Sequence, residues 1–359
     1  MSNAPFGNDP AKIERYKAFW NRDQVSRPLV GFSFVGWFPL GEFSACKAWG
    51  SSRYLTPEMI APEDFMDDYL RILREGEVLD DDLIRGACPM QVAVPFLPGM
   101  LGCKVRILPD NVLGEERHLN WREALQVKLD DQDPWFRKYM EFGQALVALS
   151  DGRFPVSHTA DLGPTDLHAV LRGHNESVVD LVDEPEKSRE LLWRMGEICR
   201  DITEEFWRRV PMFRGGYFDA QYSLWSPQPI IRMQEDATAV FSPGLYREFI
   251  QPVDRMLAGY FPCSFMHLHS TSMFLLDAIL EIDEIKCFEI NHDVSGPSLE
   301  EMIPHFQQVQ KARRPLVIRG SFTPREMQFL LDSLEPRGLF LYVMVNTMEV
   351  VEALRRVIM

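Results

Sequence analysis

Two histidines, two residues apart, end a short apolar run in the sequence Phe265-Met-His-Leu-His-Ser-Thr-Ser272. In a β-strand, residues i and i+2 point to the same face, so His267 and His269 would project together where the run ends. Paired imidazoles can bind a metal ion or act as general acids and bases. We therefore expect His267 and His269 to be catalytic residues and, if the chain binds a metal, two of its ligands.

A metal site needs at least one more ligand than these two histidines provide. Catalytic zinc commonly has three protein ligands, which combine imidazole nitrogens with thiolates or carboxylates, and one open position. Three carboxylates are expected near the same rim, those of Asp236, Glu289 and Asp293. The ligand set that we predict is His267, His269 and Glu289, holding zinc or another divalent metal. Without a metal, the histidines would serve as an acid and a base.

Further polar and aromatic side chains follow other predicted strands. Asp236 and His158 are additional candidates for catalysis, because catalytic groups gather on loops at strand ends. His292 is expected in the same cleft. The candidate substrate-binding residues are Trp37, Asp161, Tyr222, Trp225, Arg319 and Asn346. The plainer alternatives are that loop aromatics pack against the core and that loop carboxylates cap helices.

The elements that would position these residues alternate between strand and helix. The predicted strands end near Val35, Cys88, Thr159, Asp219, His269, Ile290, Arg319 and Val345. Ser298-Leu-Glu-Glu301 and Thr323-Pro-Arg-Glu326 have the spacing of capping boxes, which mark helix starts. Eight strand–helix units predict an α/β fold, a single (β/α)8 TIM barrel.

This barrel would form one domain over residues 1–359, with a helical extension at 1–27 and long loops at the carboxyl ends of the strands. The alternative is an open, doubly wound sheet. We favour the barrel because no Gly-rich phosphate-binding fingerprint follows any predicted strand.

Charge and composition narrow the classes of partner. The chain has 53 acidic and 38 basic side chains, a net charge of −15, which argues against nucleic acid or an anionic membrane as the main partner. A small-molecule substrate is the better prediction. No apolar run approaches the roughly eighteen residues of a membrane span, and six scattered cysteines without a CxxC pair favour reduced thiols. We expect a cytoplasmic protein.

Several motifs occur in an order and spacing that is typical of one enzyme family. They are Leu162-Gly-Pro-Thr-Asp-Leu-His-Ala-Val-Leu-Arg-Gly173 with Asp183-Glu-Pro185, Asp236 with Phe241-Ser-Pro-Gly-Leu-Tyr-Arg-Glu-Phe-Ile-Gln-Pro252, Gly102-Cys103, and the His267 strand. Together they resemble the uroporphyrinogen decarboxylase superfamily, which also contains the methylcobalamin-dependent thiol methyltransferases. The resemblance covers nearly the whole chain. It implies a (β/α)8 barrel, often a homodimer, with its cleft at the carboxyl ends of the strands.

The chain departs from the decarboxylases of that superfamily at their working residues. Those enzymes carry an arginine-rich loop after strand one and an aspartate after strand two, where this chain has Gly36-Trp37-Phe38 and Ala87-Cys88-Pro89. A tyrosine and a later histidine are replaced by Ala169 and by Asn346-Thr347. The cations that would hold a tetrapyrrole polycarboxylate are therefore missing.

The methyltransferase branch binds zinc through a His-x-Cys pair and a further cysteine after strand eight. Here His267 matches the first ligand, His269 replaces the second, and no cysteine stands near Val345. The loss of thiolates would reduce the selectivity for zinc over other divalent metals.

Three hypotheses follow. The first, which we favour, is a methyltransferase-like enzyme acting on a small methylated substrate or thiol, with a corrinoid carried by a partner protein as the candidate methyl donor. The second is a decarboxylase of a tetrapyrrole (a porphyrinogen) or another carboxylate. The third is a barrel that binds a small molecule without catalysis.

Overall fold

A parallel β-sheet forms the centre of this mixed α/β structure. The computed structural model describes residues 4–34, 39–50, 52–90, 93–109, 111–159 and 162–358. The sheet has six strands in the order β1-β11-β10-β9-β8-β7, and all neighbours are parallel. These strands are β1 Leu29–Ser33, β7 Ile230–Gln234, β8 Cys263–Leu268, β9 Cys287–Asn291, β10 Leu316–Gly320 and β11 Leu339–Met344.

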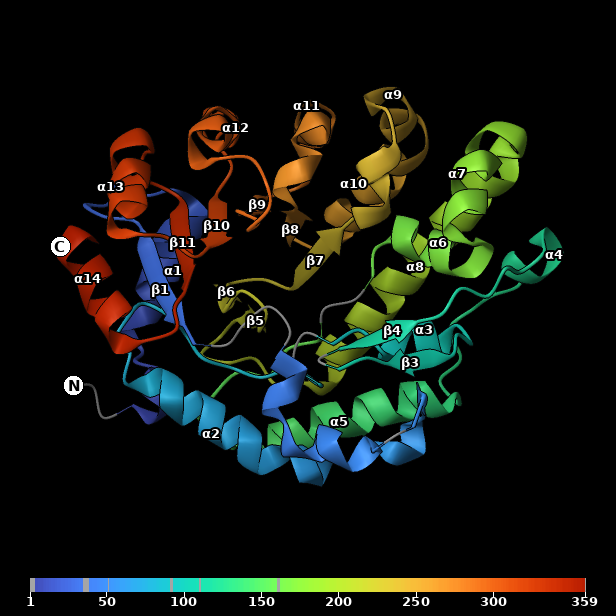
Figure 1. Ribbon diagram of the computed structural model, residues 1–359, viewed down its shortest axis with the longest axis horizontal. Helices are drawn as coiled ribbons and strands as arrows, with labels where there is room; N and C mark the ends of the chain where they lie inside the picture. The colour runs from blue at the N-terminus through green and yellow to red at the C-terminus, as the bar shows by residue number, and fades with distance from the viewer. Residues whose placement is uncertain are drawn as a thin grey trace.

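Helices cover the outer side of the sheet, in an arc that runs from α14 to α10 (Figure 1). The α-helices are α1 Ala11–Asn21, α2 Met66–Glu77, α3 Phe96–Met100, α4 Trp121–Ala124, α5 Pro134–Ser150, α6 Pro164–Arg172, α7 His174–Asp183, α8 Pro185–Arg209, α9 Pro243–Leu245, α10 Gln251–Tyr260, α11 Leu276–Leu280, α12 Leu299–Lys311, α13 Pro324–Ser333 and α14 Met348–Ile358. No helix of the described residues is long and apolar enough to cross a membrane.

The remaining strands of the described residues form two smaller antiparallel sheets. One contains β2 Tyr54–Leu55, β3 Val105–Ile107 and β4 Val112–Gly114, and the other is a hairpin of β5 Tyr217–Asp219 and β6 Leu224–Ser226. The hairpin lies within the ring of helices, next to the central sheet (Figure 1).

The central strands bury both of their faces. In β8, Met266 and Leu268 belong to the core between the sheet and the helices, whereas Cys263 and Phe265 belong to a second, inner core. Because side chains alternate along a strand, His267 faces the same side as Phe265. The inner core is completed by α1 and by the β5–β6 hairpin, whose Tyr222 ring packs 5.7 Å from that of Phe265.

Most of the strand predictions are confirmed. Five predicted strands correspond to β1, β8, β9, β10 and β11, although Val35 lies outside the described residues. Both predicted capping boxes are present, at the starts of α12 and α13.

The prediction of a fourth parallel strand ending at Asp219 is wrong. That segment is β5, which pairs antiparallel with β6, and the parallel strand next to β8 is β7. The segment 215–219 begins with two glycines and continues with aromatic residues, a pattern typical of a turn followed by a strand. Its pairing partner, β6, begins only five residues after it ends. A local hairpin therefore competes successfully with the long-range parallel pairing.

The second and third predicted strands pair only weakly. Segments 82–88 and 154–159 share one isolated parallel bridge, between Ala87 and Val156. The first of these segments continues the sheet beyond β1, since the N–H of Asp82 donates to the carbonyl of Val30 at 3.1 Å.

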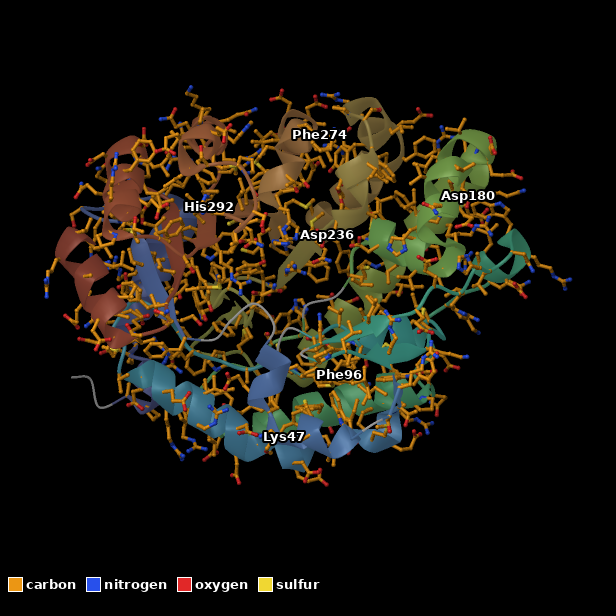
Figure 2. All side chains as sticks on the ribbon, in the orientation of Figure 1. Lys47, Phe96, Asp180, Asp236, Phe274 and His292 are labelled. Atoms are coloured by element: carbon orange, nitrogen blue, oxygen red, sulfur yellow. The ribbon has the colours of Figure 1, made fainter. Side chains whose placement is uncertain are left out.

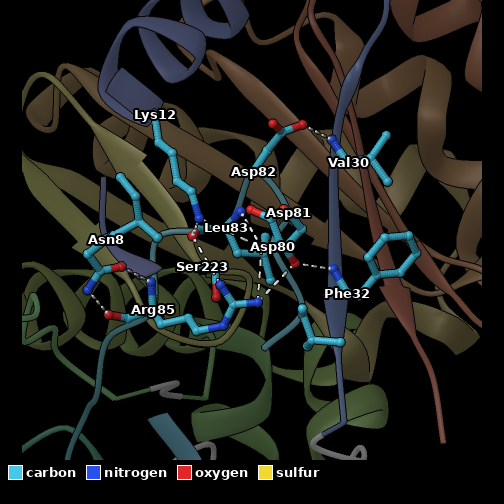
Figure 3. Close-up of polar contacts among 12 residues, drawn as sticks. Asn8, Lys12, Val30, Phe32, Asp80, Asp81, Asp82, Leu83, Arg85 and Ser223 are labelled. Carbon is cyan, nitrogen blue, oxygen red and sulfur yellow. Dashed lines mark hydrogen bonds and ion pairs between the residues drawn. The ribbon is translucent and has the colours of Figure 1, made fainter. Parts of the chain in front are cut away.

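Carboxylates replace the missing ladder bonds at this edge of the sheet (Figure 3). The N–H of Val30 donates to Asp82 at 2.9 Å, and the N–H of Phe32 donates to Asp81 at 2.7 Å. Asp81 is also 2.9 Å from the guanidinium of Arg85, and the Asp81 side chain is only 1% exposed. Side-chain oxygens thus satisfy strand donors that a regular neighbouring strand would otherwise bind.

This edge provides a test of the fold. Replacing Asp81 with alanine should lower the free energy of unfolding by about 3 kcal/mol, because it leaves the buried Arg85 without its carboxylate and removes the acceptor of the Phe32 N–H. Urea unfolding monitored by circular dichroism measures this loss. The adjacent Asp80→Ala is the matched control, since Asp80 is exposed. Equal losses in the two variants would contradict the role given to Asp81.

Candidate functional site

The strand register brings four polar side chains together at the carboxyl ends of β7, β8 and β9. Gln234 pairs in register with His267, and His267 pairs in register with Glu289. Asp236 begins a short 3-10 helix, Asp236–Val240, two residues beyond β7. Figure 2 shows Asp236 on the inner side of the ring of helices.

His267 is held by two buried side chains. Its Nδ1 atom is in hydrogen-bonding contact with Oε2 of Glu289 and lies 2.8 Å from the hydroxyl of Tyr222. The side chains of His267 and Glu289 are 4% and 0% exposed. The imidazole plane is therefore fixed through Nδ1, and Nε2 is left as the nitrogen that can take a ligand.

His269 is held in the same way, but nearer the solvent. Its Nδ1 lies 3.0 Å from Oδ1 of Asp293, and the other carboxylate oxygen accepts bonds from the N–H and hydroxyl of Ser270. Although burial opposes ionisation, these bonds lower the pKa of Asp293 to about 2. An ionised carboxylate only accepts hydrogen bonds, so Nδ1 of His269 is the donor and Nε2 is again left for a ligand.

Asp236 is positioned by a buried network behind it. The amide of Gln234 lies 3.3 Å from the carboxylates of both Asp236 and Asp166. Asp166 also accepts bonds from the N–H groups of Ala237 and Gly163, at 2.8 and 3.1 Å. Gly163 allows this approach, because a Cβ there would lie 1.6 Å from the carbonyl oxygen of Gln234.

Asp236, His267 and His269 form a group with the composition of a metal site. One potential ligand atom of each lies within 4.8 Å of the others. Metal-bound histidines almost always have a carboxyl or carbonyl group at their second ring nitrogen, and both imidazoles here have a carboxyl group at Nδ1. Two imidazoles and one carboxylate suit zinc and several other divalent metals. The residues present thus fit a divalent cation.

The local charges keep the buried histidine in the form that binds metals. Burial, with the nearby cation of Arg232, lowers the pKa of His267 well below its usual range, and burial raises the pKa of Glu289 to about 8. The hydrogen bond to Asp293 raises the pKa of His269. A neutral imidazole is the ligand form, and the lowered pKa of His267 favours that neutral form.

Arg319 connects this region to a small internal cavity. Its guanidinium lies 5.5 Å from the centre of the Tyr222 ring and 5.6 Å from that of Tyr342. Arg319, Tyr342, Ser33 and Gln221 line part of a cavity of about 70 Å³. The structure therefore places Tyr222 and Arg319, two of the predicted substrate-binding residues, beside the histidines.

Glu289, which the sequence suggested as a third metal ligand, lies against the ring of His267. It contacts Nδ1 of His267 and lies outside the group of potential ligand atoms, in which Asp236 takes the third place. The sequence could not distinguish the two carboxylates, because Glu289 lies in β9 and Asp236 follows β7, and both of these strands are adjacent to β8.

His158 lies close to the network but faces a separate space. It is 3% exposed, its Nδ1 donates to the carbonyl of Thr159 at 2.7 Å, and burial lowers its pKa to about 4. It shares a cavity of about 20 Å³ with Arg232 and Gln234. His158 therefore lies beside Arg232 and Gln234 and outside the group of Asp236, His267 and His269.

Three other predicted residues are not brought to the cluster. Trp225 is 1% exposed in the inner core, and its indole N–H donates to the carbonyl of Phe213 at 3.0 Å. His292 stacks on Phe322, and Asn346 is exposed after β11. Trp37 and Asp161 lie outside the described residues.

Gln234, Asp166 and Arg232 were not predicted from the sequence. Gln234 and Arg232 belong to β7, the strand that was placed instead at 215–219. The alternation in Ile230-Ile-Arg-Met-Gln234, bounded by Pro229, is the signal that could have identified them.

Comparisons with known proteins give a likeness in fold. No protein-family model and no curated protein sequence matches the chain. Among solved structures, a methyltransferase from Methanosarcina mazei is similar over 96% of both chains, with a TM-score of 0.65 and 13% identity. A mannanase from Bacillus subtilis aligns over 99% of this chain and 91% of the mannanase chain, with 9% identity. Its TM-score of 0.33 is too low to indicate a shared fold. The chain therefore shares its overall fold with the methyltransferase.

The contact between His269 and Asp293 can be tested by titration. In metal-free protein, Asp293→Asn should lower the pKa of His269, because the anionic acceptor that favours the imidazolium is removed. NMR titration of the imidazole carbon-bound protons measures this change. Asp283→Asn is the control, since that carboxylate is 92% exposed. An unchanged pKa of His269 in Asp293→Asn would show that the bond is not formed in solution.

Proposed function

We propose that this chain is a divergent member of the uroporphyrinogen decarboxylase superfamily that transfers a methyl group between small molecules with the help of a divalent metal. The observation that carries the proposal is the group of Asp236, His267 and His269, in which carboxylates hold both Nδ1 atoms. The fold shared with a methyltransferase supports the same reaction class. We also propose that the fold is an eight-stranded barrel, in which the segments 82–88 and 154–159 supply the two strands beyond the six of the central sheet.

The proposed ligands are Nε2 of His267, Nε2 of His269 and the carboxylate of Asp236. When bound, a divalent metal would lower the pKa of a thiol or water acceptor, so that the acceptor is anionic near neutral pH. Glu289 and Asp293 fix the two imidazole planes, and Gln234 with Asp166 fixes Asp236. These buried partners reduce the reorganisation needed when the acceptor arrives.

The chemistry that we assign to the site is a nucleophilic displacement. The anionic sulfur of a thiol acceptor attacks the methyl carbon, the bond between that carbon and the donor breaks, and its electron pair stays with the donor. The thiol proton leaves to solvent. We propose a corrinoid carried by a partner protein as the donor, and a small thiol as the acceptor.

Decarboxylation is less well supported by the residues present. Removing carboxylate groups from a porphyrinogen requires several cations to hold the others and an anion to stabilise charge on the ring. The arginine loop and the strand-two aspartate that would supply them are absent from the sequence. Decarboxylation is therefore the alternative reaction that the activity assay must distinguish from methyl transfer.

Metal content tests the proposed ligands. Protein purified without chelator should contain about one zinc or other divalent ion per chain, and His267→Ala, His269→Ala and Asp236→Asn should each lose most of it. Elemental analysis by plasma mass spectrometry measures the stoichiometry. His305→Ala, on α12, is the control and should retain the metal. Metal that is absent from the parent protein, or unchanged in His267→Ala, would overturn the ligand assignment.

Activity tests the reaction class. Methyl transfer from methylcobalamin to small thiols should be measurable, and His269→Ala should reduce its rate at least about a hundredfold through loss of the activated acceptor. Uroporphyrinogen decarboxylation is assayed in parallel. Robust decarboxylation that survives His269→Ala, without methyl transfer, would replace this proposal with the decarboxylase.

A further inference from the structure

A basic groove lies at the opposite end of the central strands from the histidines. It is lined by residues just before β9 and β10 and at the start of β8, namely Lys286, Pro315 and Cys263. Six residues of β-strand separate Cys263 from His269, which corresponds to about 20 Å. The groove is therefore distinct from the proposed metal site.

The groove collects cations from segments far apart in the sequence. Its six basic residues are Arg22, Lys286, Lys311, Arg313, Arg314 and Arg337, and its one acidic residue is Glu335. The whole chain carries a net charge of −15. Glu335 and Asp283, which pairs with Arg314, offset two of the six cations, and the remaining excess of four positive charges creates a field that attracts anions.

Most of these cations are not neutralised by carboxylates. Arg314 pairs with Asp283 at 2.8 Å, and Arg337 approaches Glu335 at 4.0 Å. Within the described part of the chain, Arg22, Lys286, Lys311 and Arg313 have no carboxylate at ion-pair distance. On the outer helices, by contrast, Arg247, Arg255 and Arg208 each have a glutamate partner at 2.7 to 2.8 Å.

One guanidinium is held rigidly in the groove. Nη1 of Arg22 donates to the carbonyls of Gln310 and Arg314, at 3.1 and 3.2 Å, which fixes α1 to the end of α12. The remaining N–H groups of a planar guanidinium are suited to phosphate oxygens. Trp20, Pro227 and Pro262 add apolar surface to the same groove.

We propose that this groove binds a small polyphosphate, either free or as part of a nucleotide. Its volume of about 660 Å³ is within the range of small-molecule sites. A single phosphate would meet only one or two of the cations, whereas a chain of two or more phosphates can contact cations from several segments. The site lies at the amino ends of the strands, so its ligand acts apart from the proposed methyl transfer.

Titration calorimetry with inorganic pyrophosphate and with adenosine diphosphate tests this site. At low salt, at least one of them should bind with one site per chain, and raising the salt concentration should weaken the binding because the contacts are exposed charges. Tighter binding of adenosine diphosphate would identify a nucleotide, and equal binding would identify the free polyphosphate. Absence of binding by both probes at millimolar concentration would overturn the proposal.

Paired variants locate the binding. Lys311→Gln combined with Arg313→Gln should weaken the affinity at least about tenfold, through the loss of two charge-assisted contacts. Arg247→Gln, which removes a cation that is paired with Glu281, should leave the affinity unchanged. Thermal melting verifies that all variants fold. Equal affinity in the double variant and the parent would contradict the assignment to this groove, whatever the outcome of the methyl-transfer assay.

Discussion

The arrangement of the site depends on the hydrogen bond between Glu289 and His267 across β8 and β9. The two residues are partners in the parallel register, so the sheet itself fixes their approach. Both are buried, and a buried polar pair is costly unless its groups are bonded. Because this contact occupies Nδ1, Nε2 is the nitrogen of His267 that can take a ligand. A shift of the register by one residue would turn His267 to the other face of the sheet.

A second constraint acts at the edge of the sheet. Beyond β1, the chain uses the carboxylates of Asp81 and Asp82 where a regular strand would offer carbonyls. The close fit extends to apolar groups, since a Cβ at Gly31 would lie 2.0 Å from the side chain of Leu83. Charged side chains in this position satisfy the donors of β1 without a regular ladder. Segment 82–88 can therefore follow an irregular path and still be attached firmly to the sheet.

The sequence predicted the regular half of the molecule better than the irregular half. Apolar runs identified β9, β10 and β11, and capping boxes identified the helices after β9 and β10, because those signals are local. The hairpin at 217–226 was mistaken for a parallel strand, since its short antiparallel partner has no distinct pattern. Within the site, the spacing of His267 and His269 was informative. The proximity of Asp236 to both histidines was not predictable, because it depends on which strand neighbours β8 on each side.

The central claim is that Asp236, His267 and His269 bind one divalent metal, while Glu289 and Asp293 orient the histidines. The most direct measurement is a crystal structure of zinc-loaded protein, with anomalous scattering recorded on both sides of the zinc absorption edge. The account predicts one anomalous peak, coordinated by Nε2 of both histidines and by the carboxylate of Asp236. A peak bound to Glu289, or the absence of any peak at His267, would contradict it.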